Sequence, residues 1–133
     1  LFRSANAEEA LIALILTNPD TARHISQILP PDKFCTDFNR RVYEALIGRI
    51  MAGKAASLTE LSGEFSMEET GRIAKILARF GHDGLLQPES ADSYIQAILQ
   101  EKEKLKTEDA ASAAPEDIRD YLERLKKQKT GGQ

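Results

Sequence analysis

The residue types that most often do chemistry are sparse in this chain of 133 residues, which contains two histidines and one cysteine. His24 and Cys35 lack the clustered cysteine, histidine and carboxylate neighbours that a metal site requires. His82 precedes Asp83 in a glycine-flanked segment, where the two could act as a base and its orienting acid. A solvated turn is the preferred interpretation, because no nucleophile lies nearby in the sequence. Cys35 is expected to pack as a small hydrophobic residue.

Two pairs of neighbouring carboxylates, Glu8-Glu9 and Glu68-Glu69, are the other candidates for chemistry. Each pair falls in the first turn of an expected helix, where the helix dipole favours negative charge. Adjacent helical residues point about 100° apart, which is poor geometry for acid–base partners. The chain also lacks a phosphate-binding loop, a nucleophile elbow and a dinucleotide fingerprint. We therefore expect no catalytic residue, metal ligand or cofactor site in this chain.

The hydrophobic pattern is helical throughout, and no segment shows the two-residue alternation of a strand. Residues 7–17 are apolar on most of the helical circumference, which predicts a central, buried helix. The predicted fold class is all-α: a helical bundle, then a long connecting helix and a C-terminal helical hairpin. The bundle subdomain is expected over residues 1–100 and the hairpin subdomain over residues 101–133.

Residues that cap or break helices predict the boundaries between these elements. Ser-x-x-Glu capping boxes are expected to open two helices in the middle of the chain, and the long helix is expected to run past Lys104. The predicted signals are a cap at Asn18 with Pro19 in the first turn, a stop at Pro30-Pro31, a cap at Asp37, a stop at Gly53, capping boxes at Ser57–Glu60 and Ser66–Glu69, a weak hinge over residues 110–114, and a last helix from Pro115.

Charge and composition exclude several kinds of partner. The net charge is -3, which argues against strong nonspecific binding to nucleic acid. Arg40, Arg41 and Arg49 could form a small basic patch, but a solvated helix face is preferred because acidic residues surround them. No apolar run approaches the roughly 20 residues of a membrane span. A single cysteine fits a reducing cytoplasm.

The first half of the chain resembles a domain of bacterial DNA replication. The matching stretches are residues 7–16, Asn18-Pro19-Asp20, residues 29–34 and residues 38–46. Their order resembles the helical domain shared by the C-terminus of bacterial DNA primase and the N-terminus of the replicative helicase. In that family the domain performs no catalysis and holds primase and helicase together at the fork.

Residues 92–105 and 120–127 resemble the long helix and last helix of the primase domain, so the primase is the preferred member of the pair. The resemblance implies a fragment that binds the hexameric replicative helicase and modulates its activity in the bacterial cytoplasm, with weak or no DNA binding and no membrane contact. The parent primase would synthesise short RNA primers and would carry zinc and magnesium outside this fragment. The chain starts at Leu1, so we expect it to be a piece of a longer protein. The residues expected at the helicase interface are Ile118, Arg119, Tyr121, Leu122, Arg124, Leu125 and Lys127.

Two alternatives remain open. The chain could be the N-terminal domain of the replicative helicase itself, which would self-associate as a collar. It could also be an unrelated helical module that binds nucleic acid. Affinity for a cognate helicase and for single-stranded DNA would separate these readings.

Overall fold

The computed structural model describes residues 4–81 and 86–113, with side chains described through residue 107. These residues form α-helices, two short 3-10 helices and no strand, so the predicted all-α class is confirmed. No helix among them is both long enough and apolar enough to cross a membrane. The elements are α1 (Ala5–Thr17), α2 (Thr21–Ile28), η1 (Pro31–Lys33), α3 (Asp37–Met51), α4 (Leu58–Leu61), α5 (Met67–Phe80), η2 (Pro88–Ser90) and α6 (Ala91–Ala113).

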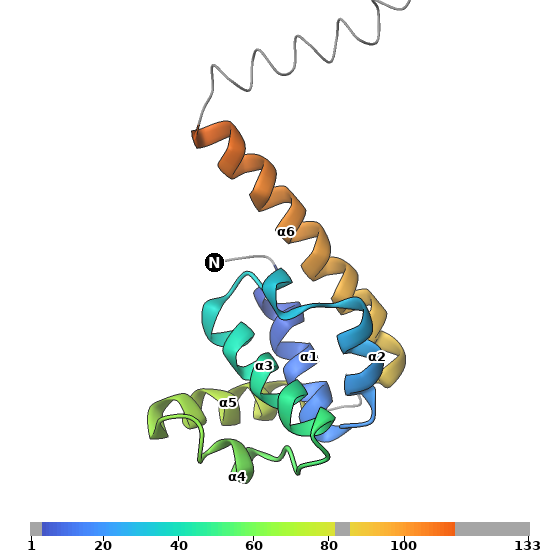
Figure 1. Ribbon diagram of the computed structural model, residues 1–133, viewed down its shortest axis with the longest axis vertical. Helices are drawn as coiled ribbons and strands as arrows, with labels where there is room; N and C mark the ends of the chain where they lie inside the picture. Colours follow the sequence, from blue (N-terminus) through green and yellow to red (C-terminus); the bar gives the residue numbers. More distant parts are fainter. Residues whose placement is uncertain (1–3, 82–85, 114–133) are drawn as a thin grey trace, which may run out of the picture. The chain divides into compact units, whose positions relative to one another are not determined.

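Helix α1 is the centre of the core, as the sequence predicted. It contacts α2, α3 and α5 (Figure 1). Every residue from Ala10 to Ile15 is 0% exposed, so polar side chains would have no access to water there. A helix with neighbours on several sides has to be apolar on most of its circumference, which explains the apolar run in the sequence.

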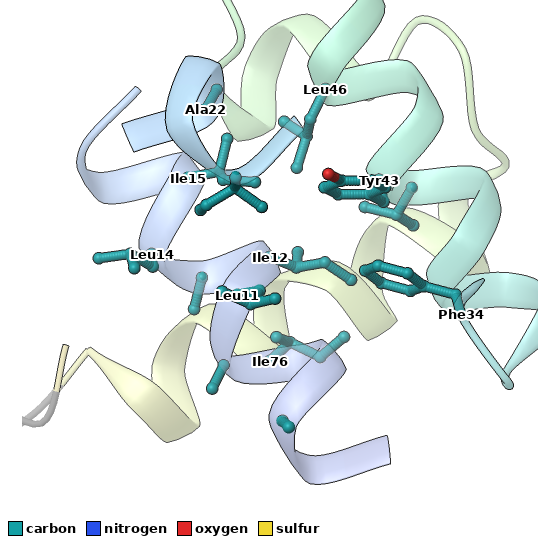
Figure 2. Close-up of a cluster of buried hydrophobic side chains, with 14 of the residues drawn as sticks. Leu11, Ile12, Leu14, Ile15, Ala22, Phe34, Tyr43, Leu46 and Ile76 are labelled. Carbon is teal, nitrogen blue, oxygen red and sulfur yellow. The ribbon is translucent and has the colours of Figure 1, made fainter. Parts of the chain in front are cut away.

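Aromatic rings fill the space between α1 and α3. Figure 2 shows Ile12 of α1 close to Tyr43 and Phe34. The rings of Phe34 and Tyr43 are stacked, with centroids 4.5 Å apart and an interplanar angle of 19°. The buried Tyr43 hydroxyl donates a hydrogen bond of 2.7 Å to the carbonyl of Leu29. Burial raises the pKa of Tyr43 above its ordinary value. This packing fixes α3 against both α1 and the end of α2.

Several predicted helix boundaries are confirmed. Helix α2 ends at Ile28, before the two prolines, and Pro31 begins the short helix η1. Helix α3 ends at Met51, and Gly53 adopts a φ of 73°, a left-handed conformation that glycine allows without a steric penalty. The Ser66–Glu69 capping box is complete, because each side chain accepts a hydrogen bond from the backbone amide of the other residue.

Other boundaries differ from the predictions. Asn18 does not cap α2 with its side chain; its carbonyl instead accepts hydrogen bonds from Thr21, in a turn that delays the helix to that residue. Thr36, rather than Asp37, occupies the position before α3. At Ser57 only half of the expected capping box forms, because the serine accepts from the amide of Glu60. The helical spacing of Ala22, Ile25, Ile28 and Leu29 predicts that all four face the core, but Ile28 is 40% exposed at the end of α2.

Helix α6 follows η2 and runs through Ala113, so residues 110–113 of the predicted hinge are helical. Its buried residues are Ala91, Ile95 and Ile98, close to its beginning. Internal contacts divide the chain into two compact units, Leu1–Lys102 and Glu103–Gln133. The predicted last helix from Pro115, the second arm of the hairpin, lies outside the described residues. The subdomain division therefore stays a prediction.

Candidate functional site

The residues predicted from the sequence to form an interface all lie outside the described part of the chain. An interface made of an apolar stripe with a charged rim therefore stays a prediction. The stripe consists of Ile118, Tyr121, Leu122 and Leu125, and the rim of Arg119, Arg124 and Lys127. The described part of the chain offers three other candidates for a functional site. They are the titratable residues, the arginines of α3, and the surface between α1 and α5.

The contacts of His24 and Cys35 are those of structural residues. His24 lies within 2.8 Å of an Asp92 carboxylate oxygen, and this exposed pair joins α2 to the beginning of α6. Cys35 is a half-buried free thiol beside the core residue Phe34. Among the described residues, no group of three or more histidines, cysteines or carboxylates could hold a metal ion. His82 and Asp83 lie outside the described residues.

Glu8 is a buried carboxylate. The sequence predicted only that it lies in the first turn of a helix, where the helix dipole favours negative charge. It is 0% exposed. Its two oxygens accept hydrogen bonds from the backbone amides of Cys35 (2.7 Å) and Thr36 (3.4 Å), and from the side chains of Asn39 (3.1 Å) and Ser4 (3.2 Å). Such a set of donors compensates for the loss of hydration. Glu8 therefore ties α1 to the segment that enters α3, which is a structural role.

The arginines of α3 are each neutralised by nearby carboxylates. Arg41 forms an ion pair of 2.7 Å with Glu69, and Arg40 pairs with Asp37 and Glu44. Arg49 lies 3.6 Å from Glu60 and 3.8 Å from Glu64. This pairing supports the solvated-face interpretation of these arginines over a nucleic-acid patch.

The Glu69 carboxyl combines two functions. Its pKa is lowered, first by the hydrogen bond from the Ser66 backbone amide and then by the hydrogen bond from Arg41. The same contact raises the pKa of the Arg41 guanidinium. The cap of α5 is thus linked to α3 by one carboxylate.

Arginines also stack on the aromatic rings between α3 and α5. The Arg72 guanidinium lies 3.9 Å from the centroid of the Phe38 ring. Arg41 lies 5.4 Å from the Phe65 ring, and the two phenylalanine rings meet edge to face at 6.3 Å. The stacking covers apolar rings with charged groups that stay in contact with water.

A cationic pocket lies between α1 and α5. Its volume is about 210 Å³, and it is lined by Glu9, Arg72, Lys75, Ile76 and Arg79. The three cations recur at positions i, i+3 and i+7, so they share one face of α5. Only Arg79 is paired with the carboxylate of this pocket, at 3.0 Å from Glu9. The sequence-based expectations did not include this cluster, although the i, i+3, i+7 spacing of its cations is visible in the sequence.

A comparison with protein families tests the resemblance. The family model of the DnaB-like helicase N terminal domain matches residues 1–101. No curated protein and no solved structure matches the chain. The match overturns the preferred identification as a primase domain and favours the helicase alternative.

The primase identification rested on residues 92–105 and 120–127. Their sequence pattern, a charged helix followed by a short amphipathic helix, is common among exposed helices in general. The expected primer synthesis, and the zinc and magnesium of a primase parent, are withdrawn with it, and the match does not confirm a separate hexameric helicase as the partner of this chain. The helicase N-terminal domain is the non-catalytic part of its parent. Because the match covers residues 1–101, and so most of the chain, this protein belongs to the family of DnaB-like helicase N-terminal domains.

Proposed function

We propose that this chain is the non-catalytic N-terminal part of a replicative DNA helicase and that it acts by associating with copies of itself. The family match over residues 1–101 is the observation that carries the proposal. A domain of this kind holds neighbouring subunits together, while other parts of the parent protein supply the motor. By the resemblance described above, a primase is the second partner at the fork, and the bacterial cytoplasm is the place of action.

The apolar stripe predicted near the C-terminus is the surface we propose for self-association. Ile118, Tyr121, Leu122 and Leu125 recur at helical spacing, and a short helix is marginally stable without something to pack against. A stripe of this kind loses its exposed apolar area when it meets a second copy. Arg119, Arg124 and Lys127 would form the charged rim around it.

Analytical ultracentrifugation of the 133-residue chain tests the proposal. We expect a species of at least twice the 14.7 kDa of one chain, and a shift towards monomer on dilution. Tyr121→Ala combined with Leu125→Ala should shift the equilibrium towards monomer, because buried anchors typically cost about 2 kcal/mol or more on truncation.

The matched control is Arg124→Ala combined with Lys127→Ala, which removes only rim charges. These variants should change the association rate more than the dissociation rate. A wild-type chain that stays monomeric at high concentration would contradict self-association. If the double mutant at Tyr121 and Leu125 still self-associates, the interface lies on the bundle instead.

Titration of labelled single-stranded DNA separates this function from that of a nucleic-acid binder. The net charge of -3 and the pairing of the α3 arginines with carboxylates disfavour phosphate contacts. We expect negligible affinity at physiological salt. Submicromolar affinity would favour the nucleic-acid module instead.

A further inference from the structure

The pocket between α1 and α5 has an excess of positive charge on a chain whose net charge is negative. Arg72, Lys75 and Arg79 face one carboxylate, that of Glu9. Arg79 is paired with Glu9 and also donates to the side-chain oxygen of Asn6. This leaves Arg72 and Lys75 as the cations available to a ligand.

Neither Arg72 nor Lys75 forms an ion pair among the residues that the structure describes. Arg72 is held instead against the Phe38 ring, at 3.9 Å, so its guanidinium is positioned without being neutralised. Glu68 lies one turn earlier on the same helix, but no ion pair joins it to Arg72 within the described residues. This differs from α3, where each arginine has a carboxylate within 4 Å.

The lining of the pocket suits a peptide better than a bare anion. Ile76, a core residue that is 6% exposed, lines the pocket, and the aliphatic stems of the neighbouring long side chains add apolar surface. A ligand that combines carboxylates with an apolar side chain matches this lining. A phosphate backbone would use the cations alone and would leave the apolar part uncovered.

A two-fold contact centred on the pocket is unfavourable. Residues close to a two-fold axis face their own counterparts, so Arg72 and Lys75 of one copy would lie opposite Arg72 and Lys75 of the other. Like charges in that arrangement repel. The pocket therefore stays accessible when copies of the chain associate through another surface.

We propose that the pocket between α1 and α5 binds an acidic segment of a different protein, with its carboxylates on Arg72 and Lys75 and an apolar side chain against Ile76. The proposal is independent of the self-association described above. Electrostatic contacts of this kind are exposed, so they set association rate and specificity and weaken as salt is added.

Fluorescence anisotropy with a labelled peptide of repeated Glu-Glu-Leu units tests the proposal on the complete chain. A peptide of repeated Gln-Gln-Leu units and an oligothymidylate are the comparison probes. We expect binding of the acidic peptide, weaker binding at higher salt, and little binding of the other two. Tighter binding of the oligothymidylate, or no binding of the acidic peptide, would overturn the proposal.

Charge-reversal variants test whether the acidic peptide binds in the pocket. Arg72→Glu combined with Lys75→Glu should weaken binding of the acidic peptide about tenfold, since exposed ion pairs are individually weak and two of them are lost. The matched control is Arg23→Glu combined with Lys54→Glu, which makes the same change in net charge at exposed positions outside the pocket. Equal weakening by both pairs would show that only net charge matters and would contradict the pocket.

Two further measurements keep the result interpretable. Lys75→Glu alone should preserve the fold, because this exposed side chain has no ion pair within the described residues, and it should still weaken binding. Circular dichroism checks folding, and ultracentrifugation of the same samples checks self-association. Unchanged binding by a folded Lys75→Glu variant would count against the proposal, whatever its oligomeric state.

Discussion

Glu8 shows how one residue joins segments that are distant in sequence. Its carboxylate accepts hydrogen bonds from Cys35, Thr36 and Asn39, while Ser4 donates from within its own helix turn. A charged group at 0% exposure is tolerated only when donors replace its hydration. The carboxylate is therefore part of the core, although its residue type suggests the surface.

We expect Glu8→Gln to lower the free energy of unfolding by about 2 kcal/mol, because hydrogen bonds to a buried charged group are lost and the new amide donors face existing donors. Urea denaturation followed by circular dichroism measures the change. Glu9→Gln is the matched control: its partly exposed pair with Arg79 contributes less than about 1 kcal/mol. Equal costs at the two positions would contradict the role assigned to Glu8.

Glu69 gives the stability a defined dependence on pH. Its pKa in the folded chain lies below the ordinary value of 4.5, so the folded state binds this proton less readily than the unfolded state. The stabilisation is therefore fully present above the unfolded pKa and is lost as the pH falls through the folded pKa. We expect the stability difference between wild type and Glu69→Gln to be constant above about pH 5 and to narrow in acid. A difference that stays constant down to low pH would contradict this linkage.

At the scale of elements, α5 combines three tasks along one helix. Its first turn is closed by the Ser66–Glu69 capping box, and its buried face presents Ile73, Ile76 and Phe80 to the core. Its exposed face carries the cations of the pocket. Because all three tasks share one helix, the burial of Ile73, Ile76 and Phe80 also fixes the direction of the cationic face.

Ser66→Ala should lower the free energy of unfolding by about 1 kcal/mol, because an orphan amide at the start of α5 loses its acceptor. Ser57→Ala is the comparison, and we expect a smaller effect, since Ser57 caps the four-residue helix α4 with half of a capping box. Thermal or urea denaturation of both variants measures the difference. A larger loss at Ser57 would show that α4 contributes more to stability than its length indicates.

At the scale of the whole molecule, the chain separates into the units Leu1–Lys102 and Glu103–Gln133. The first unit contains the buried hydrophobic residues of α1 to α5 and those at the beginning of α6. It therefore has a core of its own. The region matched by the family, residues 1–101, ends within one residue of this boundary.

We expect a chain truncated after residue 106 to unfold in one cooperative thermal transition, because the deletion removes none of the core residues of the first unit. The truncated chain should also sediment as a monomer if residues 118–125 carry the self-association. Calorimetry and ultracentrifugation measure the two properties separately. Loss of cooperativity would mean that the deleted residues stabilise the bundle.

The sequence by itself determined the all-α class, the central position of α1, and the ends of two helices ahead of Pro30-Pro31 and Gly53, because periodicity and backbone stereochemistry act locally. It also indicated two related domains, while an unrelated helical nucleic-acid-binding module stayed open. It did not separate them: the tail residues that favoured a primase carry only the general pattern of exposed helices, and the match over residues 1–101 indicated the helicase.

Only the tertiary structure decided which charged residues are paired and which are free. Glu8 and Glu9 are neighbours in sequence, yet one is buried among amide donors and the other pairs with Arg79 across to α5. Arg41 is neutralised by Glu69, whereas Arg72 stacks on Phe38 and faces a pocket. These differences depend on which helices pack together, and contacts between residues far apart in the chain are not encoded in local periodicity.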